Sequence, residues 1–255
     1  MQGILITGIA GSGKTTLTKN YVEWLRNRFN ARACAVNLDP GVMELPYRAI
    51  FDAREIVRVN DLMVSEGLGP NGALIRATEI LAERVDEVVE RISSLNYDYV
   101  VIDTPGQMEV FALRWAGRVI SEELRKVMSL AGVFLGDHEP GREVIDSVTA
   151  AFLSKIVELK LGIPMVPTVN KMDLWKDLKI KETWESFLRG DVERSRLLIE
   201  REFGVLSELL IELSEALKSF SSPVRVIPIS ATRAIGFSEL FDAINEIWCA
   251  CGDLT

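Results

Sequence analysis

The chain has 255 residues, of which 48% are hydrophobic and 26% charged, and its formal net charge is −8. This composition excludes wholesale disorder, and the negative charge argues against a general nucleic-acid-binding surface. No apolar run approaches the roughly 20 residues that cross a bilayer, and the first eight residues lack the features of a secretory signal. Three cysteines are too few for a disulfide framework and favour reduced thiols. We therefore expect a cytoplasmic protein without a direct nucleic-acid or membrane partner.

Short, nearly continuous apolar segments alternate with helical patterns along the chain. Such segments predict the strands of a mostly parallel sheet with helices on both faces, an α/β three-layer sandwich. The six expected core strands lie at residues 4–7, 31–38, 97–103, 132–136, 163–169 and 224–229.

Apolar stripes at helical spacing predict helices between these strands, at residues 74–92 and 144–159. A third stripe, at residues 206–220, is close to a heptad repeat and fits core packing better than a subunit contact. Two connections, at about residues 40–96 and 174–222, are too long for a plain crossover. We expect a single domain, spanning the whole chain, with two helical insertions.

The first expected strand leads into Gly-Ile-Ala-Gly-Ser-Gly-Lys-Thr, which matches the phosphate-loop pattern G-x-x-x-x-G-K-[ST] ahead of a predicted helix. Glycines let backbone N–H groups surround a phosphate, and the helix N-terminus adds partial positive charge. Lys14 is expected to reach the β- and γ-phosphates and Thr15 to ligate Mg²⁺. This motif predicts a nucleoside triphosphate site but does not separate ATPase, GTPase and kinase. The predicted phosphate-binding residues are Gly8, Gly11, Ser12, Gly13, Lys14, Thr15, Thr16 and Gly106.

Asp39 follows the second expected strand and is the first catalytic candidate. At that end of the strand it points toward the phosphates, where it positions the attacking water or the Mg²⁺ shell. An Asp-initiated turn through Pro40 and Gly41 explains the same residues nearly as well.

The third expected strand ends in Asp-Thr-Pro-Gly-Gln, residues 103–107. A carboxylate at the C-terminal end of a strand beside the phosphate loop is placed to organise Mg²⁺, so Thr15 and Asp103 are the predicted metal residues. The N–H of Gly106 can donate to the γ-phosphate. Gln107 is the second catalytic candidate, because its amide can hold a water in line with that phosphate.

The single histidine, His138, follows the fourth expected strand on the ligand edge of the sheet. We interpret it as a structural loop residue, with a proton carrier or a dimer contact as the alternatives.

The fifth expected strand ends in Asn-Lys-Met-Asp, the Asn-Lys-x-Asp guanine-recognition motif of translation-factor GTPases. The Asp173 carboxylate can accept from guanine N1–H and N2–H₂, whereas adenine leaves it unpaired. Ser-Ala-Thr after the last strand resembles the segment whose backbone N–H caps guanine O6. The predicted guanine-binding residues are Asn170, Lys171, Asp173 and Ala231.

Gly-Pro-Asn at residues 69–71 lies in the first long connection. With the Asn-Leu-Asp-Pro, Asp-Thr-Pro-Gly-Gln and Asn-Lys-x-Asp motifs, it closely resembles the GPN-loop GTPases over essentially the whole chain, as an archaeal-type member. The resemblance implies a P-loop NTPase fold and a homodimer that hydrolyses GTP with Mg²⁺, in which Asn71 reaches the phosphates of the partner subunit. Ile9 stands where MinD-type dimeric ATPases carry an extra lysine, so that mechanism is not encoded.

Taken from the residues alone, Asn71 is expected to be the N-cap of a helix at residues 72–94. A helix N-terminus aimed at phosphate is itself an anion site, so the cap and the catalytic role are compatible.

The leading functional hypothesis is a Mg²⁺-dependent, homodimeric enzyme that hydrolyses GTP to GDP and phosphate. Eukaryotic relatives act in RNA polymerase II assembly and nuclear import, so a protein partner in RNA polymerase or other complex assembly is expected by family analogy alone. The first alternative is a nucleotide-gated assembly or chaperone factor with incidental slow hydrolysis, which a strong nucleotide dependence of partner affinity would favour. The second is a P-loop kinase, against which the guanine motif argues.

Overall fold

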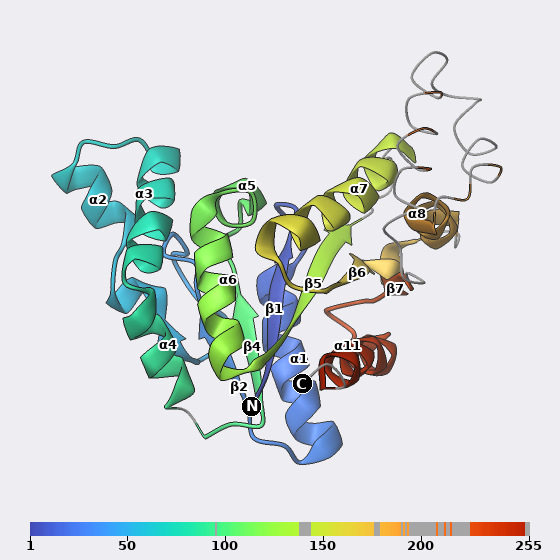
Figure 1. The fold of residues 1–255 in the computed structure, drawn as a ribbon, viewed down its shortest axis with the longest axis horizontal. Helices are drawn as coiled ribbons and strands as arrows, with labels where there is room; N and C mark the ends of the chain where they lie inside the picture. The colour runs from blue at the N-terminus through green and yellow to red at the C-terminus, as the bar shows by residue number, and fades with distance from the viewer. Residues whose placement is uncertain are drawn as a thin grey trace.

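The computed structural model describes residues 1–94, 96–137, 144–175, 179–189 and 225–252, with the isolated positions 191, 193, 208, 212 and 215 (Figure 1). The strands are β1 (Gln2–Gly8), β2 (Ala33–Asn37), β3 (Ala49–Asp52), β4 (Tyr99–Asp103), β5 (Ser129–Asp137), β6 (Met165–Asn170) and β7 (Ile227–Pro228). The helices are α1 (Lys14–Phe29), α2 (Val59–Ser65), α3 (Pro70–Glu83), α4 (Val85–Ser93), α5 (Met108–Phe111), α6 (Trp115–Val127), α7 (Val144–Leu161), α8 (Lys179–Arg189) and α11 (Phe237–Gly252). Two short 3₁₀ helices, η1 (Ala53–Glu55) and η2 (Met172–Leu174), follow β3 and β6.

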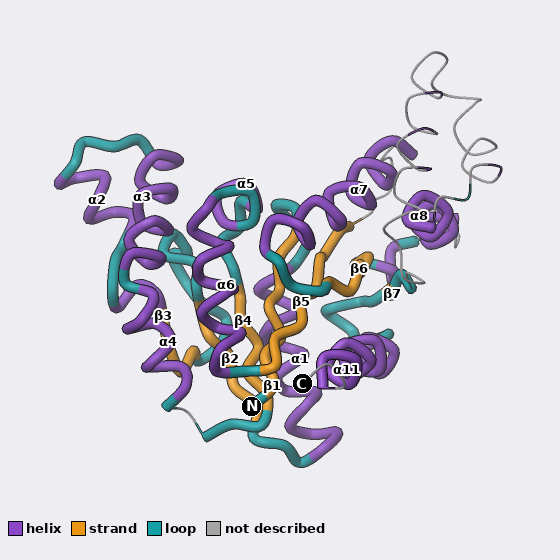
Figure 2. Tube along the Cα trace, viewed as in Figure 1, coloured by secondary structure: helices purple, strands orange, loops and turns teal. Residues whose placement is uncertain are grey.

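The described strands form one seven-stranded sheet in the order β3-β2-β4-β1-β5-β6-β7, with every adjacent pair parallel. Alternate residues of β1 enter different cores: Ile4 and Ile6 pack with α1 and α11, while Leu5 packs with α4, α6 and α7. Figure 2 shows these helices on the two sides of the sheet. The predicted three-layer α/β sandwich is therefore confirmed.

Parallel pairing decides where the motifs meet. The carboxyl ends of all the strands lie at one edge of a parallel sheet, and ligands bind there. The loops after β1, β2, β4, β6 and β7 carry the motifs singled out above. Segments far apart in the sequence thus converge on one site.

We expected the first long connection to be helical, but it also contains the strand β3. This four-residue strand pairs with β2 and extends the sheet at its edge. Phe51 anchors it by packing into the core shared with α4 and α6. The segment is too short to show an alternating pattern, which explains why the sequence did not predict it.

The prediction that Asn71 caps a helix at residues 72–94 is wrong. The helix begins two residues earlier, at Pro70, and Gly69 is its N-cap, with the Ala73 N–H donating to the Gly69 carbonyl at 2.9 Å. Proline suits the first helical position because its missing N–H is not needed there. Asn71 consequently lies inside the first turn, and the expected single helix is divided into α3 and α4 at Arg84.

The helix expected at residues 144–159 is confirmed as α7. Val148 and Ala151 of α7 are buried, although Leu159 at the end of that stripe is 70% exposed. The stripe at residues 206–220 and His138 lie outside the described residues. Among the described helices, none combines the length and the hydropathy that crossing a membrane requires.

Candidate nucleotide-binding site

The loop between β1 and α1 follows a path that requires glycine. Gly8, Gly11 and Gly13 have φ angles of 146°, 77° and 95°. A Cβ atom on Gly8 would lie 2.1 Å from the Leu135 carbonyl oxygen, and one on Gly13 would lie 2.6 Å from Nδ2 of Asn170. The chain therefore turns tightly between strand and helix, which is the backbone arrangement that wraps a phosphate.

Lys14 connects this loop to the segment that follows β4. Its Nζ donates three hydrogen bonds of 2.9 Å, to the carbonyls of Gly8, Ile9 and Gly106. Burial lowers the pKa of Lys14, while the negative charges of Asp103 and Asp39 oppose that shift. The ammonium is thus held between the two segments that we predicted to face the phosphates.

Asp103 ends β4 with a buried carboxylate whose two oxygens differ. Oδ2 accepts a 3.0 Å hydrogen bond from the Tyr47 hydroxyl, whereas Oδ1 has no hydrogen-bond partner within the described residues. Burial raises the pKa of Asp103 to about 6, against the lowering effect of the Thr15 and Tyr47 hydroxyls. An unpaired buried carboxylate oxygen near a threonine hydroxyl is a donor set that suits Mg²⁺, which prefers oxygen ligands. The residues therefore fit the ion that the phosphate loop implies.

The Asp39 carboxylate accepts two hydrogen bonds from backbone N–H groups, one within its own turn and one from the segment after β4. Its Oδ1 accepts from the Gly41 N–H at 2.9 Å, as in an Asp-initiated turn, and its Oδ2 accepts from the Gly106 N–H at 3.2 Å. The second bond brings Asp39 against the segment after β4. It also engages the N–H that we predicted to donate to the γ-phosphate.

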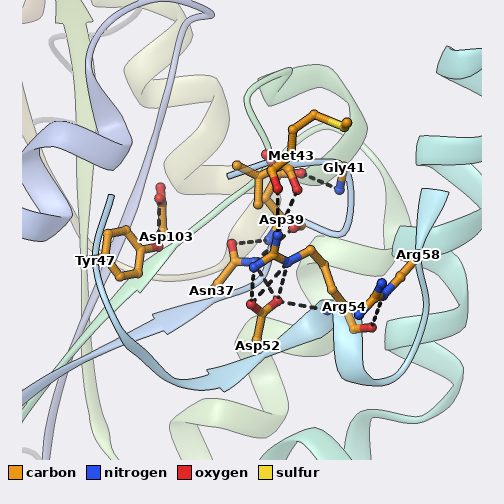
Figure 3. Close-up of polar contacts among 10 residues, drawn as sticks. Asn37, Asp39, Gly41, Met43, Tyr47, Asp52, Arg54, Arg58 and Asp103 are labelled. Atoms are coloured by element: carbon orange, nitrogen blue, oxygen red, sulfur yellow. Dashed lines mark hydrogen bonds and ion pairs between the residues drawn. The ribbon is translucent and has the colours of Figure 1, made fainter. Parts of the chain in front are cut away.

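A polar network that the sequence did not predict holds the Asp39 loop (Figure 3). Asn37 Nδ2 donates to the Asp39 carbonyl at 3.0 Å and to Asp52 Oδ1 at 2.9 Å. Arg54 pairs with Asp52 at 2.6 Å and donates to the Met43 carbonyl at 3.0 Å. Asp52 is the last residue of β3, and Arg54 lies in η1 directly after it. Because the sequence did not predict β3, it gave no reason to place these two residues at the ligand edge of the sheet.

Gln107 and Asn71 meet within one chain. Nε2 of Gln107 donates to Oδ1 of Asn71 at 3.2 Å, and both residues are exposed. The Gly-Pro-Asn turn is thereby linked to the segment after β4, next to the Lys14 contact with Gly106.

The predicted guanine-binding residues also come together. The buried Asn170 amide bridges two loops: Nδ2 donates to the Ser12 carbonyl at 2.7 Å, and Oδ1 accepts from the Ala231 N–H at 2.9 Å. Asn20, which the sequence did not mark, donates to the Ala231 carbonyl at 2.7 Å. Asn170 therefore positions the phosphate loop against the loop after β7, and the Ala231 N–H is engaged in that bridge.

Lys171 and Asp173 follow β6 at the same edge. Lys171 has a φ of 63°, and its Nζ lies 2.7 Å from Oδ2 of Asp137. The Asp173 carboxylate lies 3.7 Å from the Arg233 guanidinium, in an ion pair that brings the loop after β7 to the residue predicted to bind guanine.

Comparison with known proteins finds relatives of this chain that are named as GTPases. A family model described as "conserved hypothetical ATP binding protein" matches residues 6–250. The chain is 35% identical over 254 residues to "GPN-loop GTPase PAB0955" of Pyrococcus abyssi, covering 99% of both chains. It is 30% identical to "GPN-loop GTPase 1" of Dictyostelium discoideum, covering 95% of this chain and 60% of that one. The crystal structure of PAB0955, a GTPase in apo form, matches with a TM-score of 0.83 and 33% identity over 98% of both chains.

Proposed function

Because this chain belongs to the GPN-loop GTPase family, we propose that it hydrolyses GTP to GDP and phosphate in a Mg²⁺-dependent reaction, as a homodimer in which Asn71 completes the partner's site. The observation that carries this proposal is the convergence of the phosphate loop, Asp103 and the Asn170–Asp173 segment on one edge of the sheet. The extent of the match to PAB0955 supports it.

The residues take separate roles in this proposal. Thr15 and Asp103 would hold Mg²⁺, and the ion would supply positive charge to offset that of the β- and γ-phosphates. Lys14 exchanges its backbone carbonyl partners for phosphate oxygens. Gln107 and Asp39 orient the attacking water, and Asp173 accepts hydrogen bonds from guanine. Phosphoryl transfer depends largely on positioning and charge stabilisation, which these groups supply.

The choice between guanine and adenine nucleotides tests the proposal directly, because the matching family description names ATP. Asp173 argues for GTP, since adenine would leave its carboxylate unpaired. Phosphate release should be measured with GTP and with ATP, together with the mass of the protein with and without nucleotide. Faster turnover of GTP by a dimer, without a phosphorylated acceptor, is expected. Equal turnover of ATP would contradict the assignment.

Gln107→Ala and Asp39→Ala are each expected to slow hydrolysis on the order of 100-fold while changing GTP affinity little. Both side chains are proposed to act on water in the transition state rather than on bound substrate. Single-turnover rates and equilibrium binding separate the two effects. Gln2→Ala and Asp61→Ala make the same changes away from the site and should leave both values unchanged. A proportional loss of affinity and turnover would contradict the proposed roles.

Exposed apolar side chains support contact with a second copy. Met43, Val64 and Trp115 are 76%, 87% and 51% exposed. Met43 lies in the segment after Asp39, and Val64 lies shortly before the Gly-Pro-Asn turn. Trp115 lies in the segment after Gln107. A partner subunit that receives Asn71 would cover surfaces beside these elements.

A mixed dimer distinguishes a role of Asn71 in the partner's site from a role in its own. In an Asn71→Ala subunit paired with a Lys14→Ala subunit, the only nucleotide-competent site still receives an intact Asn71 from its partner. Hydrolysis per competent site should recover relative to the Asn71→Ala homodimer. If hydrolysis does not recover in a verified heterodimer, Asn71 acts within its own chain, where it contacts Gln107.

Asn71→Ala is expected to leave the melting temperature nearly unchanged, because Gly69 and not Asn71 caps α3. Asn60→Ala, at an exposed position, is the matched control for this measurement.

A further inference from the structure

Tyr47 brings the segment between β2 and β3 back to the sheet. This is the segment that carries Asp39, and the half-buried Tyr47 packs beside the core made by α1 and α11. Its hydroxyl lies 3.0 Å from Oδ2 of Asp103, although the two residues are 56 positions apart in the sequence (Figure 3). Tyr47 thus spans from the loop of one proposed catalytic residue to the carboxylate proposed to organise Mg²⁺.

The hydrogen bond fixes the orientation of that carboxylate. Rotation about the Cβ–Cγ bond of Asp103 would turn the plane of its carboxylate, and the Tyr47 bond holds that plane in one orientation. In it, Oδ2 is engaged and Oδ1 is left as the buried oxygen that lacks a partner within the described residues.

Tyr47 acts as the donor in this pair. Burial, with Asp103 and its hydrogen bond as further causes, raises the pKa of Tyr47, so the phenol keeps its proton. A phenylalanine at this position would preserve the ring and its packing but remove the hydroxyl that donates to Oδ2 of Asp103.

We propose that Tyr47 is a positioning residue for Mg²⁺: its hydroxyl holds Oδ2 of Asp103 and thereby leaves Oδ1 available to the ion shared with Thr15. This inference rests on the proposed function and adds a residue that none of the recognised motifs contains. Partners that orient a metal-binding carboxylate change metal affinity by roughly 10–100-fold.

The experiment compares the unmodified full chain with Tyr47→Phe and with Tyr99→Phe. Tyr99 begins the same strand that Asp103 ends, so its substitution removes a hydroxyl at the far end of β4. Binding of fluorescently labelled GDP is titrated in EDTA and at increasing Mg²⁺ concentrations. Thermal unfolding verifies that each variant is folded.

Tyr47→Phe is expected to bind GDP in EDTA with unchanged affinity. The Mg²⁺ concentration that gives half of the change in GDP affinity should be roughly 10–100-fold higher in this variant. Tyr99→Phe should match the unmodified protein in its GDP affinity in EDTA and in its Mg²⁺ requirement. An unchanged or lowered Mg²⁺ requirement in Tyr47→Phe would overturn the inference, and so would an equal loss of affinity with and without Mg²⁺. If the unmodified protein showed no Mg²⁺-dependent binding, the proposed function itself would fail, and this inference with it.

Discussion

Lys14→Ala is expected to abolish tight triphosphate binding and GTP hydrolysis. Lys14 is 5% exposed, and its ammonium lies between the phosphate loop and the segment after β4. In the loaded site it would replace its carbonyl partners by phosphate oxygens. Each charged hydrogen bond there contributes about 1.5–3 kcal/mol. Loss of two such bonds lowers affinity by more than about 100-fold, because each 1.4 kcal/mol is tenfold.

Binding of GTP and release of phosphate measure this effect. Lys19→Ala is the matched control, since Lys19 lies on the same helix outside the phosphate loop. The variant also loses the contacts that join Gly8 and Ile9 to Gly106, so its folding must be verified by thermal unfolding. A folded Lys14→Ala protein that hydrolyses GTP at the parental rate would refute the assignment of the phosphate loop.

Asp173→Asn is expected to transfer base preference from guanine toward xanthine. The carboxylate is proposed to accept from guanine N1–H and N2–H₂, and the amide cannot accept both. Losing two charge-assisted bonds lowers GTP affinity by at least about 100-fold. Xanthine carries a carbonyl at position two, which accepts from the new amide. The 3.7 Å ion pair between Asp173 and Arg233 is also lost in the variant.

Affinities for GDP and for xanthosine diphosphate, measured in the variant and in the unmodified protein, test this exchange. Asp86→Asn makes the same substitution on the exposed side of α4 and should alter neither affinity. Unchanged affinity for GDP, with no gain for the xanthosine nucleotide, would remove Asp173 from the base pocket.

The sequence by itself determined the sheet and the motifs at its edge. Apolar strand segments and glycines in the phosphate loop are local signals, because they reflect burial and backbone geometry at single positions. Once strands are parallel, their carboxyl ends share one edge, so Lys14, Asp103 and Asp173 had to converge there. The same local reasoning predicted Asn71 as an N-cap, whereas it is the second residue of α3. The prediction failed because it did not consider that Pro70 could begin the helix.

Only the tertiary structure decided which side chains support those motifs. Asp52 and Arg54 reach the Asp39 loop because β3 pairs with β2, and a four-residue strand leaves no periodic signal. The hydrogen bonds from Tyr47 to Asp103 and from Asn170 to the Ser12 carbonyl join residues 56 and 158 positions apart. Such contacts depend on how packed elements bring distant loops together, and no property of either residue alone encodes them.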